Sequence, residues 1–394
     1  MILPVSKRMA SVKPSPTGAV LALATELRAA GRDVISLGAG EPDFDTPAHI
    51  CEAAIAAIHG GQTRYTPVDG TAALKAAIRA KLARENQLDY ELSQIVVTCG
   101  AKQALFNLCL GLLNPGDEAI IPAPYWVSYP DMVRLADAEP VIIETGIEQH
   151  FKITPEQLAA TITERTRLLI LNNPSNPTGA CYNKAEMAAL GAVIEQHPDI
   201  VVLSDDIYEH IYWAPDPFVS FATACPSLME RTVTTNGVSK AYAMTGWRIG
   251  YAAGPQELIN AMKTIQSQST TNACSISQAA AVEALNGDQT CVREMASAYH
   301  KRHDYFVEAL NAIEGFECRP SEGAFYAFPR VQGVLDARGM KDDIELVEFL
   351  LNEADVAAVP GSAFGAPGYV RFSFACSMEM LEESLRRIKR AVMA

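Results

Sequence analysis

The sequence predicts an α/β fold: a mostly parallel sheet covered by helices on both faces, followed by a smaller α+β domain. Short, almost continuously apolar runs alternate with segments that carry apolar residues at helical spacing, which is typical of parallel strands buried on both faces. From about Gln289 this alternation stops, and a long helical pattern with a few short strands replaces it. The length of 394 residues also favours more than one domain, since roughly 100 to 200 residues make one.

The apolar runs define the strands that we expect in the larger domain. They are Ile95–Thr98, Glu118–Ile121, Arg167–Leu171, Val201–Ser204, Arg231–Thr234 and Arg248–Ala252. Helical spacing between several of them predicts helices that include Ala104–Leu113 and Ala185–Glu195. In the smaller domain we expect a helix around Val292–Ile313, strands at Phe316–Arg319, Ala324–Pro329 and Tyr369–Phe374, and a last amphipathic helix from about Met378.

The composition excludes several classes of protein. With 49% apolar and 20% charged residues, the chain can bury a large core and is not a disordered tail. Its 32 lysines and arginines against 46 aspartates and glutamates give a net charge of −14. Because such a surface repels phosphate backbones and anionic lipid, we expect no nucleic-acid partner and no membrane. A small anionic ligand then needs a locally positive pocket.

No membrane-spanning or targeting segment is expected. No apolar run approaches the roughly 18 to 20 residues of a membrane helix. The beginning of the chain carries Lys7, Arg8 and Lys13 and is interrupted by prolines, so it does not resemble a signal peptide. The nine cysteines include no CxxC pair, which favours reduced thiols and predicts a cytoplasmic location.

Polar and small residues follow four of the predicted strands at the point where each strand ends. The segments are Cys99–Lys102, Asn172–Gly179, Asp205–Tyr208 and Thr235–Lys240. In open α/β sheets, ligands bind beyond the carboxyl ends of the strands. The sequence therefore predicts a site assembled from these four segments.

Gly100, Ala101 and Lys102 open a helix after the first of these strands. Small residues let backbone N–H groups approach a ligand, and a helix N-terminus carries about half a positive charge. The segment could cradle a phosphate, although a glycine at such a position also occurs for turn geometry alone. The chain has no GxGxxG after its first strand and no GxxxxGK[ST], which disfavours dinucleotide and Walker-type nucleotide binding.

Lys240 and Asp205 are the candidates for covalent and electrostatic chemistry. Lys240 lies in an apolar stretch, where burial lowers the pKa of a lysine and lets it form an imine with a carbonyl; the alternative is a solvated surface charge. Asp205 ends a strand, where an unpaired carboxylate is costly, so its partner is either an arginine or a protonated heterocycle. Tyr208 follows three residues later and could point the same way as a hydrogen-bond donor.

Aromatic and basic residues elsewhere complete the set of candidates. Trp126 could stack on a ring or belong to the core. Arg248 and Arg371 lie in apolar strand patterns, so they either form internal salt bridges or bind phosphate or carboxylate bidentately. His300 and His303 share one helix face, but no third ligand accompanies them, and we predict no metal site.

Taken together, these segments resemble the pyridoxal-phosphate aminotransferases of fold type I, class I. The matching segments are Gly38–Phe44, Tyr65–Gly70, Asn173–Gly179, Ser204–Glu209, Ser239–Gly250 and Arg371–Ser373. With Cys99–Asn107 and Pro124–Pro130 added, the chain looks most like the I-beta aspartate aminotransferase branch, from about Arg8 to the last helix. The resemblance implies a seven-stranded large domain at 48–288, a small domain at 14–47 and 289–394, and an N-terminal arm at 1–13.

The resemblance implies pyridoxal 5'-phosphate as the cofactor and gives the candidates their roles. Lys240 would bind the cofactor covalently and shuttle a proton, and Asp205 would keep its ring nitrogen protonated. The remaining cofactor contacts would come from Tyr208 and Asn176 at the ring oxygen, Trp126 at the ring face, and Gly100, Ala101, Lys102, Ser239 and Arg248 at the phosphate.

The resemblance also implies which residues bind the substrate and how the subunits assemble. The substrate would be an amino acid or 2-oxo acid, bound by Arg371 at its α-carboxylate, by Lys102 at a second carboxylate, and by Gly38, Trp126 and Asn176 nearby. Tyr65 would reach the phosphate of the neighbouring subunit, which implies a homodimer with shared active sites.

The predicted activity is transfer of the amino group of L-aspartate to 2-oxoglutarate in a ping-pong cycle. A rival acceptor is prephenate, with aspartate or glutamate as donor, and the segment Lys13–Thr17 bears on that choice. A second rival function is elimination or cleavage with the same cofactor. A third is a ligand-sensing module, which the sequence disfavours because no basic helix-turn-helix segment precedes Lys13.

Two residues depart from the family pattern. Gly237 stands where many relatives carry serine, so Ser239 could serve the phosphate instead. Asp206 stands where glutamate is frequent, and we expect no effect on the contact of Asp205 with the ring.

Overall fold

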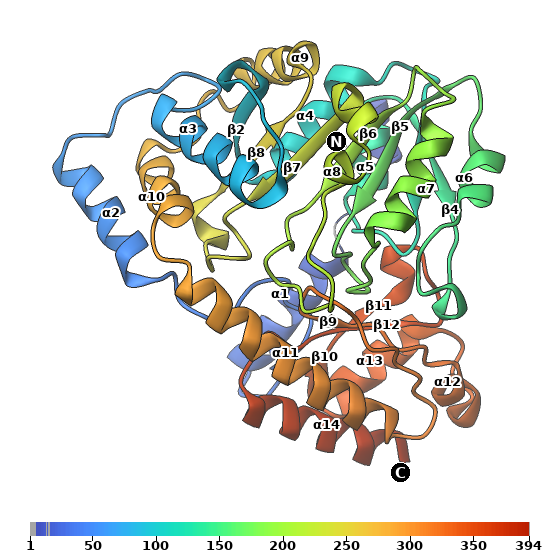
Figure 1. The fold of residues 1–394 in the computed structure, drawn as a ribbon. Helices are drawn as coiled ribbons and strands as arrows, with labels where there is room; N and C mark the ends of the chain where they lie inside the picture. Colours follow the sequence, from blue (N-terminus) through green and yellow to red (C-terminus); the bar gives the residue numbers. More distant parts are fainter. Residues whose placement is uncertain (1–4, 13, 15, 394) are drawn as a thin grey trace.

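A seven-stranded sheet forms the centre of the computed structural model, which describes residues 5–12, 14 and 16–393. The strand order is β2-β8-β7-β6-β5-β3-β4 (Figure 1). The bounds are β2 (Ile95–Cys99), β3 (Glu118–Pro122), β4 (Glu139–Ile143), β5 (Thr166–Asn172), β6 (Val201–Asp205), β7 (Thr232–Gly237) and β8 (Ile249–Ala253). All neighbouring strands are parallel except β8, which runs antiparallel to both β2 and β7. The mostly parallel sheet, with the seven strands that the resemblance implied, is confirmed.

Each strand predicted for the larger domain lies in this sheet. Its ends differ by at most one residue from the prediction, except that β7 ends three residues later than predicted, at Gly237. The strand that the apolar pattern missed is β4, at one edge of the sheet. It begins with Glu139 and Pro140, and only Ile143 is fully buried. A proline near the start of a strand is tolerated at an edge, and it weakens the strand signal in the sequence.

Helices cover both faces of the sheet, because successive strand residues point to opposite faces. Val96 packs on one face with α4 (Ala101–Leu112), α5 (Tyr129–Leu135) and α9 (Gln256–Ser267). Ile95 and Val97 point to the other face, which is covered by α2 (Ala48–His59), α3 (Ala72–Lys81), α6 (Pro155–Thr161), α7 (Lys184–Ile194), α8 (Phe221–Ala224) and α10 (Ser275–Asn286). The helices predicted at Ala104–Leu113 and Ala185–Glu195 correspond to α4 and α7.

The smaller domain lies below the sheet in Figure 1 and packs around its own core, which includes Phe306, Leu310, Phe372 and Ile388. Its helices are α1 (Pro16–Ala29), α11 (Thr290–Asn311), α12 (Gln332–Arg338), α13 (Asp343–Glu353) and α14 (Met378–Met393). Three strands form one sheet in the order β11 (Val359–Pro360), β12 (Val370–Ser373), β9 (Tyr326–Ala327). A parallel pair joins β1 (Ile35–Ser36) to β10 (Val356–Ala357). The predicted long helix, the strand at 369–374 and the last helix are therefore confirmed.

The strand predicted at Phe316–Arg319 is wrong. This segment forms only an isolated bridge between Glu317 and Arg330. Its backbone is bonded instead by a side chain, because Asn311 accepts from the Cys318 N–H and donates to the Cys318 carbonyl, both at 2.8 Å. A side chain that satisfies both backbone groups removes the need for a neighbouring strand.

Short helices connect the main elements: η1 (Lys7–Ala10), the π-helix η2 (Leu82–Asn86), η3 (Leu92–Gln94), η4 (Ile147–Gln149), η5 (Pro226–Arg231), η6 (Thr245–Trp247) and η7 (Gly361–Phe364). The domain boundaries at residues 14, 48 and 289 stay a prediction, and residues 1–4 and 13 of the expected arm lie outside the described part of the chain. Among the described helices, none has the length and apolarity that crossing a membrane requires.

Candidate active site

One edge of the central sheet brings the predicted segments together. The parallel strands β2, β5, β6 and β7 end there, with Asn172 opposite Asp205 and Asp205 opposite Thr235. Because β8 runs the other way, it begins at this edge, and Ile249 pairs with Cys99. Arg248, directly before β8, therefore lies beside Gly100, directly after β2.

A cavity of about 420 Å³ opens at this edge of the sheet. Most of the predicted site residues line it: Gly38, Ala101, Lys102, Trp126, Asn176, Asp205, Tyr208, Ser239, Lys240, Arg248 and Arg371. The segments that carry them belong to both domains, since Gly38 follows β1 and Arg371 lies on β12. Two predicted residues do not line the cavity. Gly100 packs against the Arg248 guanidinium, and Tyr65 lies elsewhere on the chain.

Lys240 follows β7, and its amine faces the cavity. The amine donates a hydrogen bond to the Gly40 carbonyl at 2.5 Å. Burial, and then the charge of Arg371, lowers the pKa of Lys240 to about 8. About a tenth of the amine is therefore uncharged at pH 7, far more than for an ordinary lysine, and the uncharged form is the one that attacks a carbonyl carbon.

Asp205 ends β6 and is 4% exposed. Its carboxylate accepts hydrogen bonds from the Tyr129 hydroxyl at 2.6 Å and from the Ile207 N–H at 3.3 Å. Burial raises the pKa of Asp205 to about 6, because no lysine, arginine or histidine of the described residues forms a salt bridge with it. An arginine partner is therefore not observed, and the buried carboxylate fits a cationic heterocycle facing it from the cavity.

Asn176 is oriented by the strand end beside it. The Asn172 side chain accepts from the Asn176 N–H at 2.7 Å and donates to the Asp205 carbonyl at 2.8 Å. The loop after β5 is thereby attached to the end of β6. Asn172 lies in the predicted segment Asn172–Gly179, but its role in holding Asn176 could not be read from the sequence.

Tyr208 shares a hydrogen bond with a residue that the sequence did not single out. Its hydroxyl lies 2.8 Å from the hydroxyl of Tyr326, which also lines the cavity. The Tyr326 ring lies under the guanidinium of Arg371, 4.4 Å from its central carbon to the ring centroid. In the sequence Tyr326 stands in the apolar run Ala324–Pro329, where it resembles a core aromatic, so no signal distinguished it.

Arg371 is 2% exposed, and hydrogen bonds within the chain fix the orientation of its guanidinium. Its Nη1 donates to Asn176 Oδ1 at 3.0 Å and its Nη2 donates to the Gly38 carbonyl at 2.8 Å. Its buried Nε has no hydrogen-bond partner among the described residues. The sequence allowed an internal salt bridge for Arg371, and none is observed with the described residues. The unpaired Nε donor is suited to the carboxylate of a ligand.

The N-terminus of α4 and Arg248 form a further part of the cavity lining. Gly100 has a φ of 78°, and a Cβ there would collide with Arg248 Nη2. Arg248 is held by the Thr245 carbonyl at 3.0 Å and the Cys99 carbonyl at 3.4 Å. The first amides of a helix have no acceptor within the helix, so together with this arginine they suit a phosphate.

Gly237 and Ser239 lie on the same strand end. A Cβ at Gly237 would lie 2.9 Å from the Ile249 carbonyl, so the backbone leaves no room for a side chain without a shift. Ser239 lines the cavity. This arrangement agrees with Ser239, rather than residue 237, as the hydroxyl on this segment that faces an anion.

Replacing Gly100 with alanine should weaken cofactor binding. The new methyl group would collide with Arg248 Nη2 and would stand on a backbone with positive φ. We expect the dissociation constant of pyridoxal phosphate to rise roughly tenfold or more, since a charge-assisted phosphate contact is lost. A fluorescence titration of the cofactor-free protein measures it. Gly116→Ala is the matched control, with a φ of 90° but open space around its Cβ, and an equal loss in both variants would contradict the steric explanation.

Lys102 and Trp126 also line the cavity. The Lys102 amine lies 4.7 Å from the centroid of the Trp126 ring, and burial, then the charge of Arg248, lowers the pKa of Lys102. Trp126 meets the Tyr129 ring edge-on with centroids 5.4 Å apart. Trp126 is thus only partly core, since part of it faces the cavity.

Tyr65 and the histidine pair of α11, His300 and His303, do not line the cavity. The Tyr65 side chain is 91% exposed. His300 stacks on Trp213, with ring centroids 5.2 Å apart. His303 is bonded to Asp304 and to the Ser321 N–H, so both of its ring nitrogens are engaged within the fold.

Comparison with known proteins decides the family. The family described as Aminotransferase class I and II matches residues 32–388. The chain belongs to this family. This aminotransferase is 54% identical over 389 residues to the aspartate/prephenate aminotransferase of Nitrosomonas europaea, covering 97% of this chain and 98% of that protein. The aspartate/prephenate aminotransferase of Cereibacter sphaeroides is also 54% identical over 389 residues, covering 98% of this chain and 97% of that one.

Solved structures agree with this assignment. The aspartate aminotransferase of Rhizobium meliloti superposes with a TM-score of 0.95 at 49% identity, over 99% of both chains. The Thermus thermophilus aspartate aminotransferase with maleate gives a TM-score of 0.94 at 44% identity, over 99% of this chain and all of that chain. The fold is therefore that of the fold type I aminotransferases.

As a member of this family, the aminotransferase uses pyridoxal 5'-phosphate. Its residues fit that group on two observations. The buried carboxylate of Asp205 forms no salt bridge with a described residue, and the absence of a side chain at Gly100 leaves room for the Arg248 guanidinium, which a Cβ would displace. When bound, the cofactor supplies an aldehyde that takes up an amino group and a ring that accepts the electrons released at the substrate α-carbon.

Proposed function

We propose that this aminotransferase transfers the amino group of L-aspartate to 2-oxoglutarate in a ping-pong cycle. The observation that carries the proposal is the pair of cationic side chains, Arg371 and Lys102, that line the same cavity as Lys240. A dicarboxylate has two anionic ends, and two separate cations suit it better than a monocarboxylate. Relatives named aspartate aminotransferase, from Rhizobium meliloti and Thermus thermophilus, support the same substrate.

In this proposal each side chain of the cavity has a separate role in binding the cofactor or in moving a proton. Lys240 would hold the cofactor at its aldehyde carbon and would carry the proton released from the substrate α-carbon. Asp205 would keep the ring nitrogen protonated, and the hydroxyl of Tyr208 and the amide of Asn176 would bond the ring oxygen. Gly100, Ala101, Lys102, Ser239 and Arg248 would bind the phosphate, and Trp126 would stack on the ring.

The substrate α-carboxylate binds Arg371, whose unpaired Nε and two nitrogens held by Asn176 and Gly38 give it a fixed orientation. A planar guanidinium binds a carboxylate with two parallel hydrogen bonds, which fixes the position of the α-carbon as well as its charge. The second carboxylate of aspartate or 2-oxoglutarate binds Lys102.

A panel of amino donors and acceptors tests the proposal. Aspartate and glutamate are each assayed with 2-oxoglutarate, oxaloacetate and prephenate, while the absorbance of the cofactor is followed. We expect aspartate with 2-oxoglutarate to turn over, and aspartate alone to convert the bound cofactor to its amine form. A cofactor that releases ammonia or a cleaved product instead would contradict transamination.

Prephenate is the second candidate acceptor, because the relatives from Nitrosomonas europaea and Cereibacter sphaeroides are named aspartate/prephenate aminotransferases. The segment Lys13–Thr17, which bears on this choice, falls largely outside what can be described: Lys13 and Ser15 lie outside the described residues, as do the side chains of Pro16 and Thr17. The prephenate arm of the panel decides between the two acceptors.

We also propose a cytoplasmic homodimer with shared active sites. The high exposure of Tyr65, 91%, in a chain otherwise rich in buried aromatics is consistent with a contact to a second copy. All nine cysteines are unpaired, which suits a reducing compartment. Sedimentation of the purified protein, and loss of activity in a Tyr65→Ala variant, test the shared site.

Replacing Arg371 with lysine should raise the Michaelis constant for aspartate roughly 10- to 100-fold, because a point charge cannot copy two parallel charge-assisted hydrogen bonds. Steady-state kinetics at varied aspartate concentration measure the change. Arg386→Lys on the exposed face of α14, where Arg386 pairs with Glu383, is the control and should behave as the wild type. An unchanged Michaelis constant in the Arg371 variant would remove this residue from substrate binding.

A further inference from the structure

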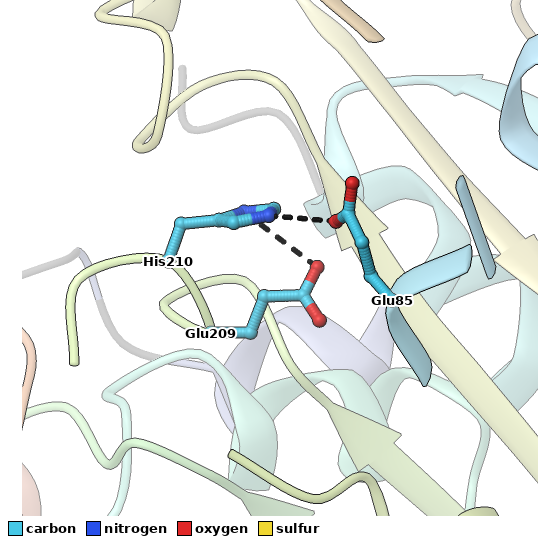
Figure 2. A group of neighbouring side chains, drawn as sticks. All are labelled: Glu85, Glu209 and His210. Atoms are coloured by element: carbon cyan, nitrogen blue, oxygen red, sulfur yellow. Dashed lines mark hydrogen bonds and ion pairs between the residues drawn. The ribbon is translucent and has the colours of Figure 1, made fainter. Parts of the chain in front are cut away.

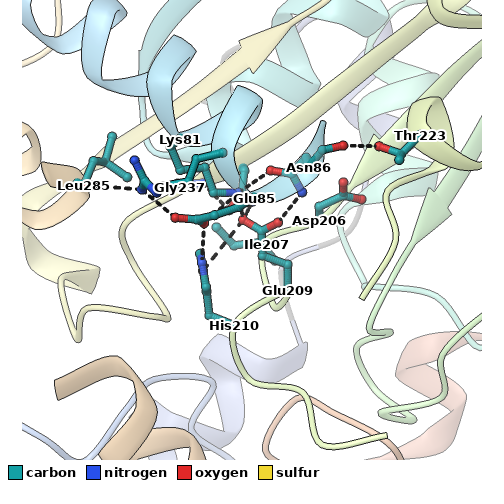
Figure 3. A network of polar contacts seen from close by, with 12 residues as sticks. Lys81, Glu85, Asn86, Asp206, Ile207, Glu209, His210, Thr223, Gly237 and Leu285 are labelled. Carbon is teal, nitrogen blue, oxygen red and sulfur yellow. Dashed lines mark hydrogen bonds and ion pairs between the residues drawn. The ribbon is translucent and has the colours of Figure 1, made fainter. Parts of the chain in front are cut away.

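A buried charged network joins four elements near the cavity without lining it. Its centre is the carboxylate of Glu209, which is 7% exposed and follows β6. Glu209 Oε1 accepts from the Lys81 amine, and Oε2 accepts from the Asn86 amide at 2.7 Å (Figure 3). Oε1 also accepts from the Asn236 amide at 2.7 Å. Lys81 also donates to Asn86 Oδ1 at 2.7 Å. The partners come from α3, η2 and β7.

The residue types in part of this network are also those of a metal site, since Glu85, Glu209 and His210 lie together (Figure 2). The ligand atoms are already engaged. His210 Nε2 lies 2.9 Å from Glu85 Oε2, and its Nδ1 lies 3.7 Å from Glu209 Oε1. The buried Lys81 amine contacts both carboxylates and supplies the positive charge that an ion would supply. The network is therefore an internal ion-pair cluster.

The network touches both strand ends that carry the proposed chemistry. Glu209 directly follows Tyr208 and stands four residues after Asp205. Asn236 stands four residues before Lys240, and its Oδ1 accepts from the Gly237 N–H at 2.7 Å. One carboxylate thus connects the turn after β6 to the backbone at the end of β7.

We propose that Glu209 is a positioning residue: through Asn236 it fixes the end of β7, with Lys240, against the turn that carries Asp205 and Tyr208. This inference rests on the proposed roles of those three residues. In those roles Lys240 and Asp205 would hold the same cofactor from two different strand ends, so the separation of the two strand ends would set the reaction geometry. A small misplacement of such groups lowers rates strongly.

The donor count explains why a carboxylate stands at this position. Three side chains, Lys81, Asn86 and Asn236, all donate to Glu209. Burial alone would raise the pKa of Glu209, but the charges of Lys81 and His210 and the hydrogen bonds from Asn86 and Lys81 lower it below its ordinary value. A glutamine offers one acceptor oxygen and turns an NH₂ group toward a donor, so at least one of the three connections is lost.

The test compares Glu209→Gln and Asn236→Ala with Glu85→Gln. Asn236→Ala leaves the bonds of Lys81 and Asn86 to Glu209 in place and removes the two bonds of the Asn236 side chain, to Glu209 and to the Gly237 N–H. Glu85 belongs to the same cluster but is bonded to Lys81, Arg84 and His210 and not to Asn236, which makes it the matched control. Each variant is measured as the cofactor-loaded protein, below the temperature at which its far-ultraviolet circular dichroism changes.

We expect kcat to fall roughly 10- to 100-fold in Glu209→Gln and in Asn236→Ala, with a changed circular dichroism of the cofactor band. The Michaelis constant for aspartate should change less than about threefold, because Arg371 is held by Asn176 and Gly38, outside the network. Glu85→Gln should stay within about twofold of the wild type in all three quantities.

Two results would overturn the proposal: an unchanged cofactor band and kcat in folded Asn236→Ala, or an equal loss in Glu85→Gln. If Glu209→Gln does not fold, Asn236→Ala decides alone, because it keeps the buried ion pair. The cofactor band is recorded without substrate, so it separates this proposal from the proposed function. A wild type that binds the cofactor but transfers no amino group from aspartate would refute the function and leave the comparison of the bands valid.

Discussion

Replacing Lys240 with alanine is expected to lower transamination by at least about 10²- to 10⁴-fold, the contribution of a positioned proton carrier. The amine of this side chain faces the cavity, and burial and Arg371 lower its pKa to about 8. Alanine removes both the nucleophile and the base while leaving the fold around β7 in place. The rate with aspartate and 2-oxoglutarate, and the absorbance of the cofactor that remains bound, measure the two losses.

Lys240→Arg is the informative companion of that variant. Arginine keeps a positive charge at the position but is not deprotonated in proteins, so it can neither attack an aldehyde nor accept a proton. We expect it to be as inactive as the alanine variant. Activity near the wild-type level in either variant would show that another amine carries the reaction.

Replacing Asp205 with asparagine should lower transamination by more than about 100-fold and at the same time stabilise the cofactor-free protein above pH 6. The activity falls because an amide does not hold the ring nitrogen in its protonated form. The stability rises because the carboxylate of Asp205 is buried and forms no salt bridge with a described residue. The charge of Lys240 offsets only part of the cost of burying it, so the ionised carboxylate destabilises the cofactor-free protein.

The sign of the pH dependence follows from the two pKa values. The pKa of Asp205 is about 6 in the fold against 3.8 in the unfolded chain, so between these values only the folded state binds the proton. The free energy of unfolding therefore falls as the pH rises through this window, by about 3 kcal/mol in total, since one unit of pKa is about 1.4 kcal/mol. Asparagine does not titrate, so the free energy of unfolding of the variant does not fall in this way.

Thermal melting of the two cofactor-free proteins checks this prediction. The variant should melt higher than the wild type at pH 8, and the difference should shrink toward pH 4. A difference in melting temperature that is the same at both pH values would indicate a change in packing and not the cost of a buried charge.

The sequence predicted the sheet and most of the cavity because both depend on local patterns. Apolar runs locate the strands, and the carboxyl ends of parallel strands meet at one edge, so polar residues after Asn172, Asp205 and Gly237 had to converge there. The antiparallel β8 was not foreseen, yet Arg248 still reached the cavity, because a reversed strand begins at the edge where its neighbours end.

The contacts that hold the site in place could not be predicted, because they join residues far apart in the chain. Tyr208 and Tyr326 are 118 positions apart, Asp205 and Tyr129 are 76 apart, and Lys81 and Glu209 are 128 apart. A single tyrosine or glutamate in an apolar segment carries no local signal of such a partner. The edge strand β4 and the hydrogen bonds between Asn311 and Cys318 were not predicted for a related reason. In both places the backbone conformation depends on contacts with distant parts of the fold and not on the local sequence pattern.

The unpaired Nε of Arg371 has a consequence for the compounds that compete with amino acids in the cell. An amine without a carboxyl group, such as the product of decarboxylating an amino acid, would enter the cavity and leave this buried donor without an acceptor. Sites built to bond a polar group of this kind reject an analogue that lacks it by about 10⁴- to 10⁵-fold. With Arg371 in the role proposed for it, we expect the guanidinium to exclude biogenic amines from the reaction without any steric barrier.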